Sequence, residues 1–343
     1  MSISSGNVTT EDRQTPAIHT LTAASHLDER RLGYTNTMVS RREALAILAL
    51  PALSAMDQRP NMFSNAESYE RFMGRWSRLV APLLVDFANV PDSGRVLDVG
   101  SGTGSLAFAI AERKLRCHVL GIDPSREYVD YATSRNSFPD RVSFQIGDAQ
   151  ELPFPDTSFQ GSLSLLVFNF IPNPEKALQE VSRVTKPGGR IAAAVWDYGA
   201  GMRMLRAFWD AALSVDARAE ELDEKHMPLC RAGELSRLWK LGGLGEVHED
   251  PLEITMRFHT FADYWDAFGL GQGPAGTFVR SLERNKLQLL RGEVKRQLSL
   301  AAENTPFALP ARVWAVRGTV PPKPARGLLP PGEHQGVITG TQV

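Results

Sequence analysis

Three aspartates each stand at the end of a short apolar run: Asp98 in VLDVG, Asp123 in VLGID and Asp148 in FQIGD. Asp98 lies just ahead of a glycine-rich loop, Gly100–Gly104 (GSGTG), whose glycines allow a tight turn and the close approach of a ligand to the backbone. If the loop held a phosphate, the Asp98 carboxylate would repel it by on the order of 3 kcal/mol at about 5 Å and an effective dielectric constant of about 20. The same carboxylate favours an ammonium or a sulfonium group, so the loop predicts a cationic ligand.

The other two aspartates suit the remaining parts of a nucleoside. Asp123 ends the second predicted strand, where a carboxylate can accept hydrogen bonds from both ribose hydroxyls. Asp148 ends the third and can accept a hydrogen bond from an adenine amino group. Each aspartate alone is equally typical of a residue that caps the following turn. Three of them beside one glycine loop predict a nucleoside-bearing ligand.

The loop departs from the dinucleotide-binding pattern G-x-G-x-x-G. Counted from Gly100, the sixth position is Ser105, and the third glycine comes one place early. A nicotinamide-dependent oxidoreductase therefore stays open as an alternative, which Asp98 and Ser105 both disfavour.

Strand-like and helical segments alternate around these residues. Five runs predict strands: GRVLDVG, CHVLGIDPS, RVSFQIGDA, SLSLLVFNF (Ser162–Phe170) and GRIAAAVWDYG. The segment NPEKALQEVSRV predicts a helix, because Asn173 can cap it and Pro174 suits its first turn. The alternation predicts a parallel sheet with helices on both faces. Two later segments, GEVHEDPLEITMRF and ALPARVWAVRG, can add two strands. The helix ahead of the first strand is predicted to place Leu79, Pro82, Leu83 and Phe87 on one face.

The motifs VLDVGSGTG, GIDPS, GDAQELPFPDTSF and RVTKPGG, in this order and spacing, resemble those of class I S-adenosylmethionine-dependent methyltransferases. The resemblance covers Tyr69–Trp196 and is closest to small-molecule methyltransferases of the quinone-biosynthesis type. It implies an α/β fold: a Rossmann-like, seven-stranded, mostly parallel sheet with a reversed last hairpin. It also implies an enzyme that moves a methyl group from S-adenosyl-L-methionine to a small-molecule acceptor. One departure is Phe159-Gln160, where these enzymes usually have Phe-Asp, and it puts only a local capping bond in doubt.

The resemblance also implies which residues bind the cofactor. The methionine part would lie against the glycine loop, the ribose against the second strand end, and the adenine against the third. The implied residues are Asp98, Gly100, Gly102, Thr103 and Gly104 for methionine, Asp123 for ribose, Asp148 and Ala149 for adenine, and Leu166 on the opposite side.

The substrate side is less determined. Methyl transfer from a sulfonium depends mostly on alignment, and a general base is needed only where the acceptor loses a proton, so we assign no catalytic residue. The segment YERFMGRWS suggests a lid that offers Tyr69, Arg75 and Trp76, and Trp196 and Asp197 follow the fifth strand. The alternatives are that the lid residues pack on the core and that Asp197 caps a loop. The glycines of FGLGQGPAG suggest a mobile loop over the acceptor.

The flanking regions differ from the central region. Residues 1–60 are predicted to be a disordered extension, residues 61–318 the methyltransferase domain with a helical insert at about 200–309, and residues 319–343 a disordered tail. The segment SRREALAILALPALSAM, Ser40–Met56, resembles a twin-arginine export signal. The chemistry uses a cytoplasmic metabolite, so we expect a cytoplasmic protein, with export as the alternative.

Composition argues against several kinds of partner. The 38 basic and 39 acidic residues give no reason to expect nucleic acid, and no apolar run reaches the roughly 18 residues of a membrane-spanning helix. No metal-ligand spacing is present, so we expect no metal. The sequence does not determine the oligomeric state, and a non-catalytic regulatory protein that binds S-adenosylmethionine stays a second hypothesis.

Overall fold

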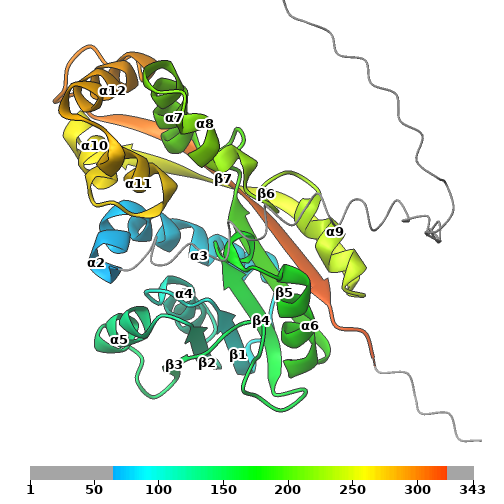
Figure 1. Ribbon diagram of the computed structural model, residues 1–343. Coiled ribbons are helices and arrows are strands. Elements are labelled where there is room, and N and C mark those ends of the chain that lie inside the picture. The colour runs from blue at the N-terminus through cyan, green and yellow to red at the C-terminus, as the bar shows by residue number, and fades with distance from the viewer. Residues whose placement is uncertain (1–64, 323–343) are drawn as a thin grey trace, which may run out of the picture. The chain divides into compact units, whose positions relative to one another are not determined.

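The computed structural model describes residues 65–322 (Figure 1). The predicted disordered extension, the export-like segment Ser40–Met56 and most of the predicted tail lie outside this range, and the domain limits stay predictions. Within residues 65–322, none of the helices is both long enough and apolar enough to cross a membrane.

A seven-stranded sheet forms the centre of the described region, in the order β3-β2-β1-β4-β5-β7-β6. The first five strands are parallel, and β7 runs antiparallel between β5 and β6. The strands are β1 (Ser93–Val99), β2 (Arg116–Asp123), β3 (Val142–Ile146), β4 (Phe159–Leu165), β5 (Thr185–Trp196), β6 (Gly245–Phe258) and β7 (Phe307–Thr319). This topology confirms the predicted Rossmann-like, mostly parallel sheet with a reversed last hairpin.

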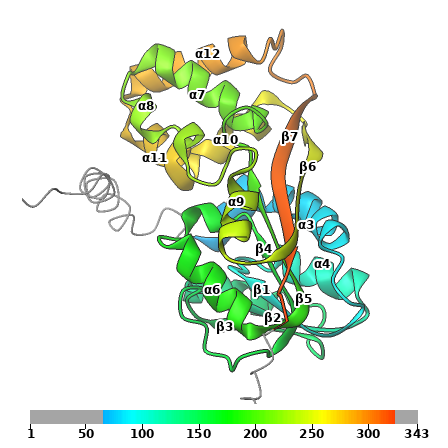
Figure 2. The ribbon, with the colours of Figure 1, turned by 90° about the vertical axis from the view of Figure 1, so that its right-hand side faces the viewer.

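Helices cover both faces of the sheet, as its parallel part requires. Figure 2 shows α3 and α4 on one face and α6 and α9 on the other. The helices of this layer are α3 (Arg75–Ala88), α4 (Ser105–Arg113), α5 (Arg126–Ser134), α6 (Pro174–Val184) and α9 (Glu234–Leu241). The predicted cap of α6 is confirmed, because the Asn173 side chain accepts a hydrogen bond from the Lys176 amide at 2.8 Å.

Helix α3 buries a different face from the one that we predicted. Leu79 is 45% exposed, whereas the buried side chains follow the stripe of Trp76, Val80, Leu84 and Ala88. This stripe has the four-residue spacing of one helix face. The prediction was wrong because two apolar stripes are present and only packing on the sheet decides between them.

The fourth strand is shorter than the predicted Ser162–Phe170. It ends at Leu165, and Leu166 takes a left-handed backbone conformation with φ 64°. The Leu166 amide still donates to the Ala194 carbonyl at 2.7 Å, and a 3₁₀ turn, η2 (Phe168–Phe170), follows. The apolar run continues past the strand because the turn is buried too.

The predicted helical insert consists of two groups of helices that lie together (Figure 1). Its aromatic side chains pack on one another: the rings of Phe208 and Phe268 stack at 4.4 Å between centroids. The first group precedes β6 and the second connects β6 to β7. The elements are α7 (Arg203–Val215), α8 (Ala219–Leu222) and the 3₁₀ turn η3 (Glu224–His226), then α10 (Phe261–Gly269), α11 (Gly273–Ser281) and α12 (Arg284–Gln297).

Candidate functional site

A cavity of about 410 Å³ lies at the carboxyl ends of the parallel strands, where open α/β sheets bind their ligands. Residues at or just after five strand ends line it. These are Asp98 and Gly100 at β1, Asp123 at β2, Asp148 and Ala149 after β3, Leu166 after β4, and Trp196 at β5. The cavity thus brings together most of the residues predicted to bind a cofactor.

The glycine loop bends back on the sheet and leaves its middle open to the cavity. The amides of Gly100 and Ser101 both donate to the Ile122 carbonyl, at 2.8 and 2.9 Å. A Cβ atom on Gly102 (φ 50°) would meet no described atom within 4 Å, whereas one on Gly100 (φ 71°) would lie 2.5 Å from the Val167 side chain. A ligand can therefore approach the backbone at Gly102.

The remaining two loop residues occupy different surroundings. Thr103 lines the cavity, and its hydroxyl donates to the Glu70 carboxylate. Gly104, the N-cap of α4 with φ 91°, is not among the residues that line the cavity. A Cβ atom there would lie 2.7 Å from Phe108 and 3.1 Å from Phe144. Gly104 thus serves the close packing at the start of the helix.

Asp98 is a fully buried carboxyl group in the cavity wall. Neither of its oxygens has a hydrogen-bond partner among residues 65–322. Burial raises the pKa of Asp98 to about 8, while the nearby Ala107 amide lowers it in part and the charge of Asp123 adds to the rise. Without a ligand, the Asp98 carboxyl group is therefore mostly protonated at neutral pH. A cation bound beside it would favour its ionised form.

Asp123 and Asp148 line the cavity and also hold their own turns. The Asp123 carboxylate accepts hydrogen bonds from the Gly102 and Ser125 amides, each at 2.9 Å. Burial raises the pKa of Asp123, and these two hydrogen bonds oppose the rise. Asp148 lies exposed at the rim and accepts from the Gln150 amide at 2.8 Å. The capping bonds and a position in the cavity wall are thus compatible, since a carboxylate has several acceptor positions.

Several buried polar atoms around the cavity have no partner. These are the two Asp98 carboxylate oxygens, Ser101 Oγ, the Tyr128 hydroxyl and Trp196 Nε1, none of which has a hydrogen-bond partner within residues 65–322. Each such atom costs about 1–3 kcal/mol when left unpaired, and native proteins keep few of them. Their gathering around one cavity fits a polar ligand with a cationic group and several hydrogen-bonding groups.

The lid segment closes one side of the cavity. Tyr69 lies in the wall with its ring 5.6 Å from that of Tyr128. Phe72 and Met73 follow in a π-helical turn, η1 (Glu70–Gly74), and also line the cavity. Such turns occur frequently at functional sites. The Glu70 carboxylate accepts a hydrogen bond from the Thr103 hydroxyl, and this bond links the lid segment to the glycine loop.

Two predicted lid residues do not reach the cavity. Arg75 donates to the Asp263 carboxylate at 2.7 Å and lies over the ring of Trp76 at 4.2 Å. Trp76 itself packs on Phe258 at 5.2 Å between ring centroids. Both side chains join α3 to α10 and β6, so for these two residues the packing interpretation is the correct one.

Asp197 also lies outside the cavity wall. Its Oδ2 atom accepts two hydrogen bonds from Arg312, at 2.7 and 2.9 Å, and its Oδ1 atom accepts from the Ala200 amide at 3.1 Å. The residue therefore holds the loop after β5, as the capping alternative predicted.

The far end of the cavity is built by residues that the sequence analysis missed. They come from η2, from the loop after β5 and from the insert: Phe170, Ile171, Pro172, Tyr198, Leu205 and Glu224. Gly273 and Pro274, which also line the cavity, belong to the segment FGLGQGPAG that was predicted to lie over the acceptor. The suggested mobile loop FGLGQGPAG is instead the end of α10, a tight turn and the start of α11. Glu224 gave no signal, because it sits in the charged run EELDEKH, which is typical of a solvated surface.

Known proteins resemble the central part of this chain. Residues 97–193 match the family described as Methyltransferase domain. An uncharacterized methyltransferase of Mycobacterium tuberculosis is 35% identical over 144 residues, which are 42% of this chain and 55% of that protein. A demethylmenaquinone methyltransferase of Renibacterium salmoninarum is 37% identical over 124 residues, 36% of this chain and 48% of that protein. The chain thus spans about half the length of the curated relatives it matches.

A solved structure also matches the chain. It is the phosphoethanolamine N-methyltransferase 2 of Haemonchus contortus in complex with S-adenosyl-L-methionine, with 19% identity and a TM-score of 0.47. The match covers 75% of this chain and 57% of that one.

Proposed function

We propose that this chain, a member of the class I S-adenosylmethionine-dependent methyltransferases, transfers a methyl group from S-adenosyl-L-methionine to a small-molecule acceptor. The observation that carries the proposal is the group of unpartnered buried polar atoms around the glycine loop, with the Asp98 carboxylate at its centre. The relatives of the matched region, methyltransferases by name, support it.

The residues at the strand ends divide the cofactor between them in this proposal. Asp98 and the open backbone at Gly102 hold the cationic methionine part. Asp123 holds the ribose hydroxyls, and Asp148 with Ala149 faces the adenine. Leu166 closes the opposite wall. When bound, S-adenosylmethionine supplies a methyl group on a sulfonium, whose sulfur is an activated leaving group.

The chain's own contribution is to align the acceptor and to exclude water. Phe72 and Met73 of the lid, with Phe170 and Leu205, give the remaining cavity mostly apolar walls. Alignment of this kind can supply several kcal/mol of the barrier reduction. The apolar walls favour an acceptor with an apolar body. A cavity that continues beyond the strand ends toward the insert also favours catalysis over the non-catalytic binder.

Calorimetric titration of the full chain with S-adenosylmethionine, S-adenosylhomocysteine and NAD tests the cofactor. We expect the first two to bind, NAD not to bind, and Asp123→Ala to lose the binding. Transfer of a labelled methyl group to a panel of small acceptors then tests the activity. A preference for NAD would revive the oxidoreductase alternative, and tight binding with no turnover on any acceptor would favour the regulatory one.

A further inference from the structure

The far end of the cavity holds a single acidic side chain among the residues that line it. Glu224 is the first residue of η3, is only 4% exposed, and belongs to the cavity wall. The other acids in the wall are the three strand-end aspartates of the nucleoside side. The other residues that the insert and η2 contribute to the cavity wall are mainly apolar, among them Leu205, Pro274 and Phe170.

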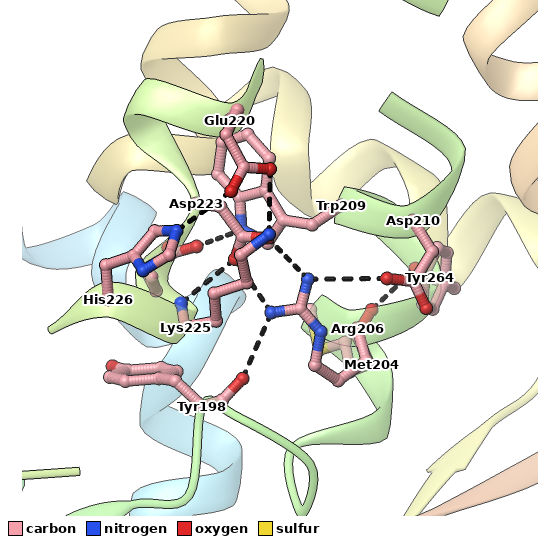
Figure 3. A network of polar contacts seen from close by, with 11 residues as sticks. Tyr198, Met204, Arg206, Trp209, Asp210, Glu220, Asp223, Lys225, His226 and Tyr264 are labelled. Carbon is pink, nitrogen blue, oxygen red and sulfur yellow. Dashed lines mark hydrogen bonds and ion pairs between the residues drawn. The ribbon is translucent and has the colours of Figure 1, made fainter. Parts of the chain in front are cut away.

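Glu224 is held in place without a cationic partner. The indole N–H of Trp209, on α7, donates to its Oε2 atom. The nearby Arg206 guanidinium is instead engaged by Asp223, whose two carboxylate oxygens each accept from it at 2.7 Å (Figure 3). Arg206 also donates to the Tyr198 carbonyl at 3.1 Å. No basic residue among residues 65–322 forms an ion pair with Glu224. The negative charge of its ionised carboxylate is therefore not neutralised by a neighbouring side chain.

The surroundings also control the proton affinity of Glu224. Burial raises its pKa to about 8, the charge of Asp223 adds to the rise, and the Trp209 hydrogen bond and the Arg206 charge oppose it. Two further titratable groups, Tyr198 and Cys230, lie near enough for the Glu224 charge to act on them, and burial raises the pKa of both. A carboxyl group whose pKa lies near neutral pH is suited to accept a proton in a reaction.

We infer that Glu224 accepts the proton of the methyl acceptor, and that the acceptor is therefore a largely apolar molecule with a hydroxyl or an amine at the reacting atom. The inference rests on the proposed function. In the step, the acceptor's oxygen or nitrogen forms a bond to the methyl carbon. The carbon–sulfur bond breaks with its electron pair staying on sulfur, and the proton of the oxygen or nitrogen passes to the Glu224 carboxylate. A carboxylate acceptor is disfavoured, because it would meet a like charge in an apolar wall.

Glu224→Gln is the informative variant. The amide oxygen can still accept the Trp209 hydrogen bond, but the side chain no longer takes up a proton. Glu220→Gln is the matched control: it lies four residues earlier on α8, its side chain is 51% exposed, and it pairs with Lys225 and His226 outside the cavity wall. Thermal unfolding of the full chain and both variants checks that all three are folded.

Three measurements use the full chain and its variants. The first is calorimetric binding of S-adenosylhomocysteine, which we expect to be equal in all three. The second is labelled methyl transfer to 1-naphthol, 1-naphthylamine and 1-naphthoic acid from pH 6 to 9. The third is infrared titration of the protonated carboxyl band in the S-adenosylhomocysteine complex, in which the bound ammonium holds Asp98, whose pKa in the free chain is also about 8, in its ionised form.

We expect the naphthol or the naphthylamine, and not the naphthoic acid, to be methylated, with a rate that rises through pH about 8. Glu224→Gln should slow this reaction by about 100-fold to 10,000-fold and remove both the pH rise and the carboxyl band that titrates there. Glu220→Gln should stay within about twofold of the unmodified chain.

Failure of S-adenosylhomocysteine to bind would reject the proposed function itself. If it binds but neither the naphthol nor the naphthylamine is methylated, the acceptor class is wrong. If Glu224→Gln matches the unmodified chain in rate and pH profile, or if no band titrates near pH 8, Glu224 is not the proton acceptor.

Discussion

Replacing Asp98 with Asn tests how the cavity recognises a cation. The substitution keeps the size of a side chain that is fully buried and removes its charge. An ammonium about 4 Å from an ionised carboxylate gains about 4 kcal/mol at an effective dielectric constant of about 20. Ionising a carboxyl group with a pKa of about 8 costs about 1.4 kcal/mol of this at pH 7. The net loss in the variant is about 3 kcal/mol, or on the order of 100-fold in Kd.

The pH dependence separates this charge effect from a packing effect. Because Asp98 must lose its proton to pair with the ligand, the affinity of the unmodified chain should rise about tenfold between pH 6 and pH 7. The Asn variant should show no such rise. S-adenosylhomocysteine, which keeps the ammonium but lacks the sulfonium, identifies the group that is recognised.

The assay is calorimetric titration in two buffers that differ in ionisation enthalpy, which counts the protons released on binding. We expect nearly one proton per ligand at pH 7 for the unmodified chain and none for Asp98→Asn. Equal affinity of the two proteins from pH 6 to pH 7, with no proton release from either, would refute the reasoning. Thermal unfolding of both proteins at pH 6 and pH 7 separates loss of the charge from loss of the fold.

Three further predictions address the loop, the sheet and the insert. Gly100→Ala should disturb the loop and abolish binding of S-adenosylhomocysteine, because its methyl group would lie 2.5 Å from Val167. Gly102→Ala should keep the fold at a cost of about 1–2 kcal/mol of unfolding free energy from its left-handed backbone, but it should weaken binding, because its methyl group would fill the open space through which the ligand approaches the backbone; denaturant unfolding and calorimetry compare the two variants. Asp197→Asn should lower the unfolding free energy by about 1–2 kcal/mol through its arginine pair and leave cofactor binding unchanged, and a change in binding alone would return Asp197 to the site. Glu224 has a pKa of about 8 in the folded chain and about 4.3 unfolded, so its stabilising effect is complete below pH about 4 and is lost toward pH 8. Glu224→Gln should remove a contribution of up to about 1.4 kcal/mol per pH unit to the slope of the unfolding free energy, measured by denaturant titration over that range, and an unchanged slope would contradict the burial argument.

The sequence alone was enough to predict the sheet and the gathering of the three strand-end aspartates at one cavity. Asp98, Asp123 and Asp148 each follow a local apolar run, and the carboxyl ends of parallel strands meet at one edge of the sheet. Residues that are local in the chain thus come together in a way that topology alone dictates. The helix cap at Asn173 was also predicted correctly, because it depends only on residues that are neighbours in the chain.

Tertiary packing alone decided the far end of the cavity and which lid residues reach it. Whether Tyr69 or Arg75 faces the cavity depends on how the lid helices are rotated about their axes. Arg75 points away from the cavity because it binds Asp263 on α10, which lies 188 residues later in the chain. Asp197 is engaged by Arg312, 115 residues away. Glu224 lies in a run of charges that predicts exposure, yet the insert buries it against Trp209. No local pattern carries these outcomes, since each depends on which distant side chain arrives at the same place.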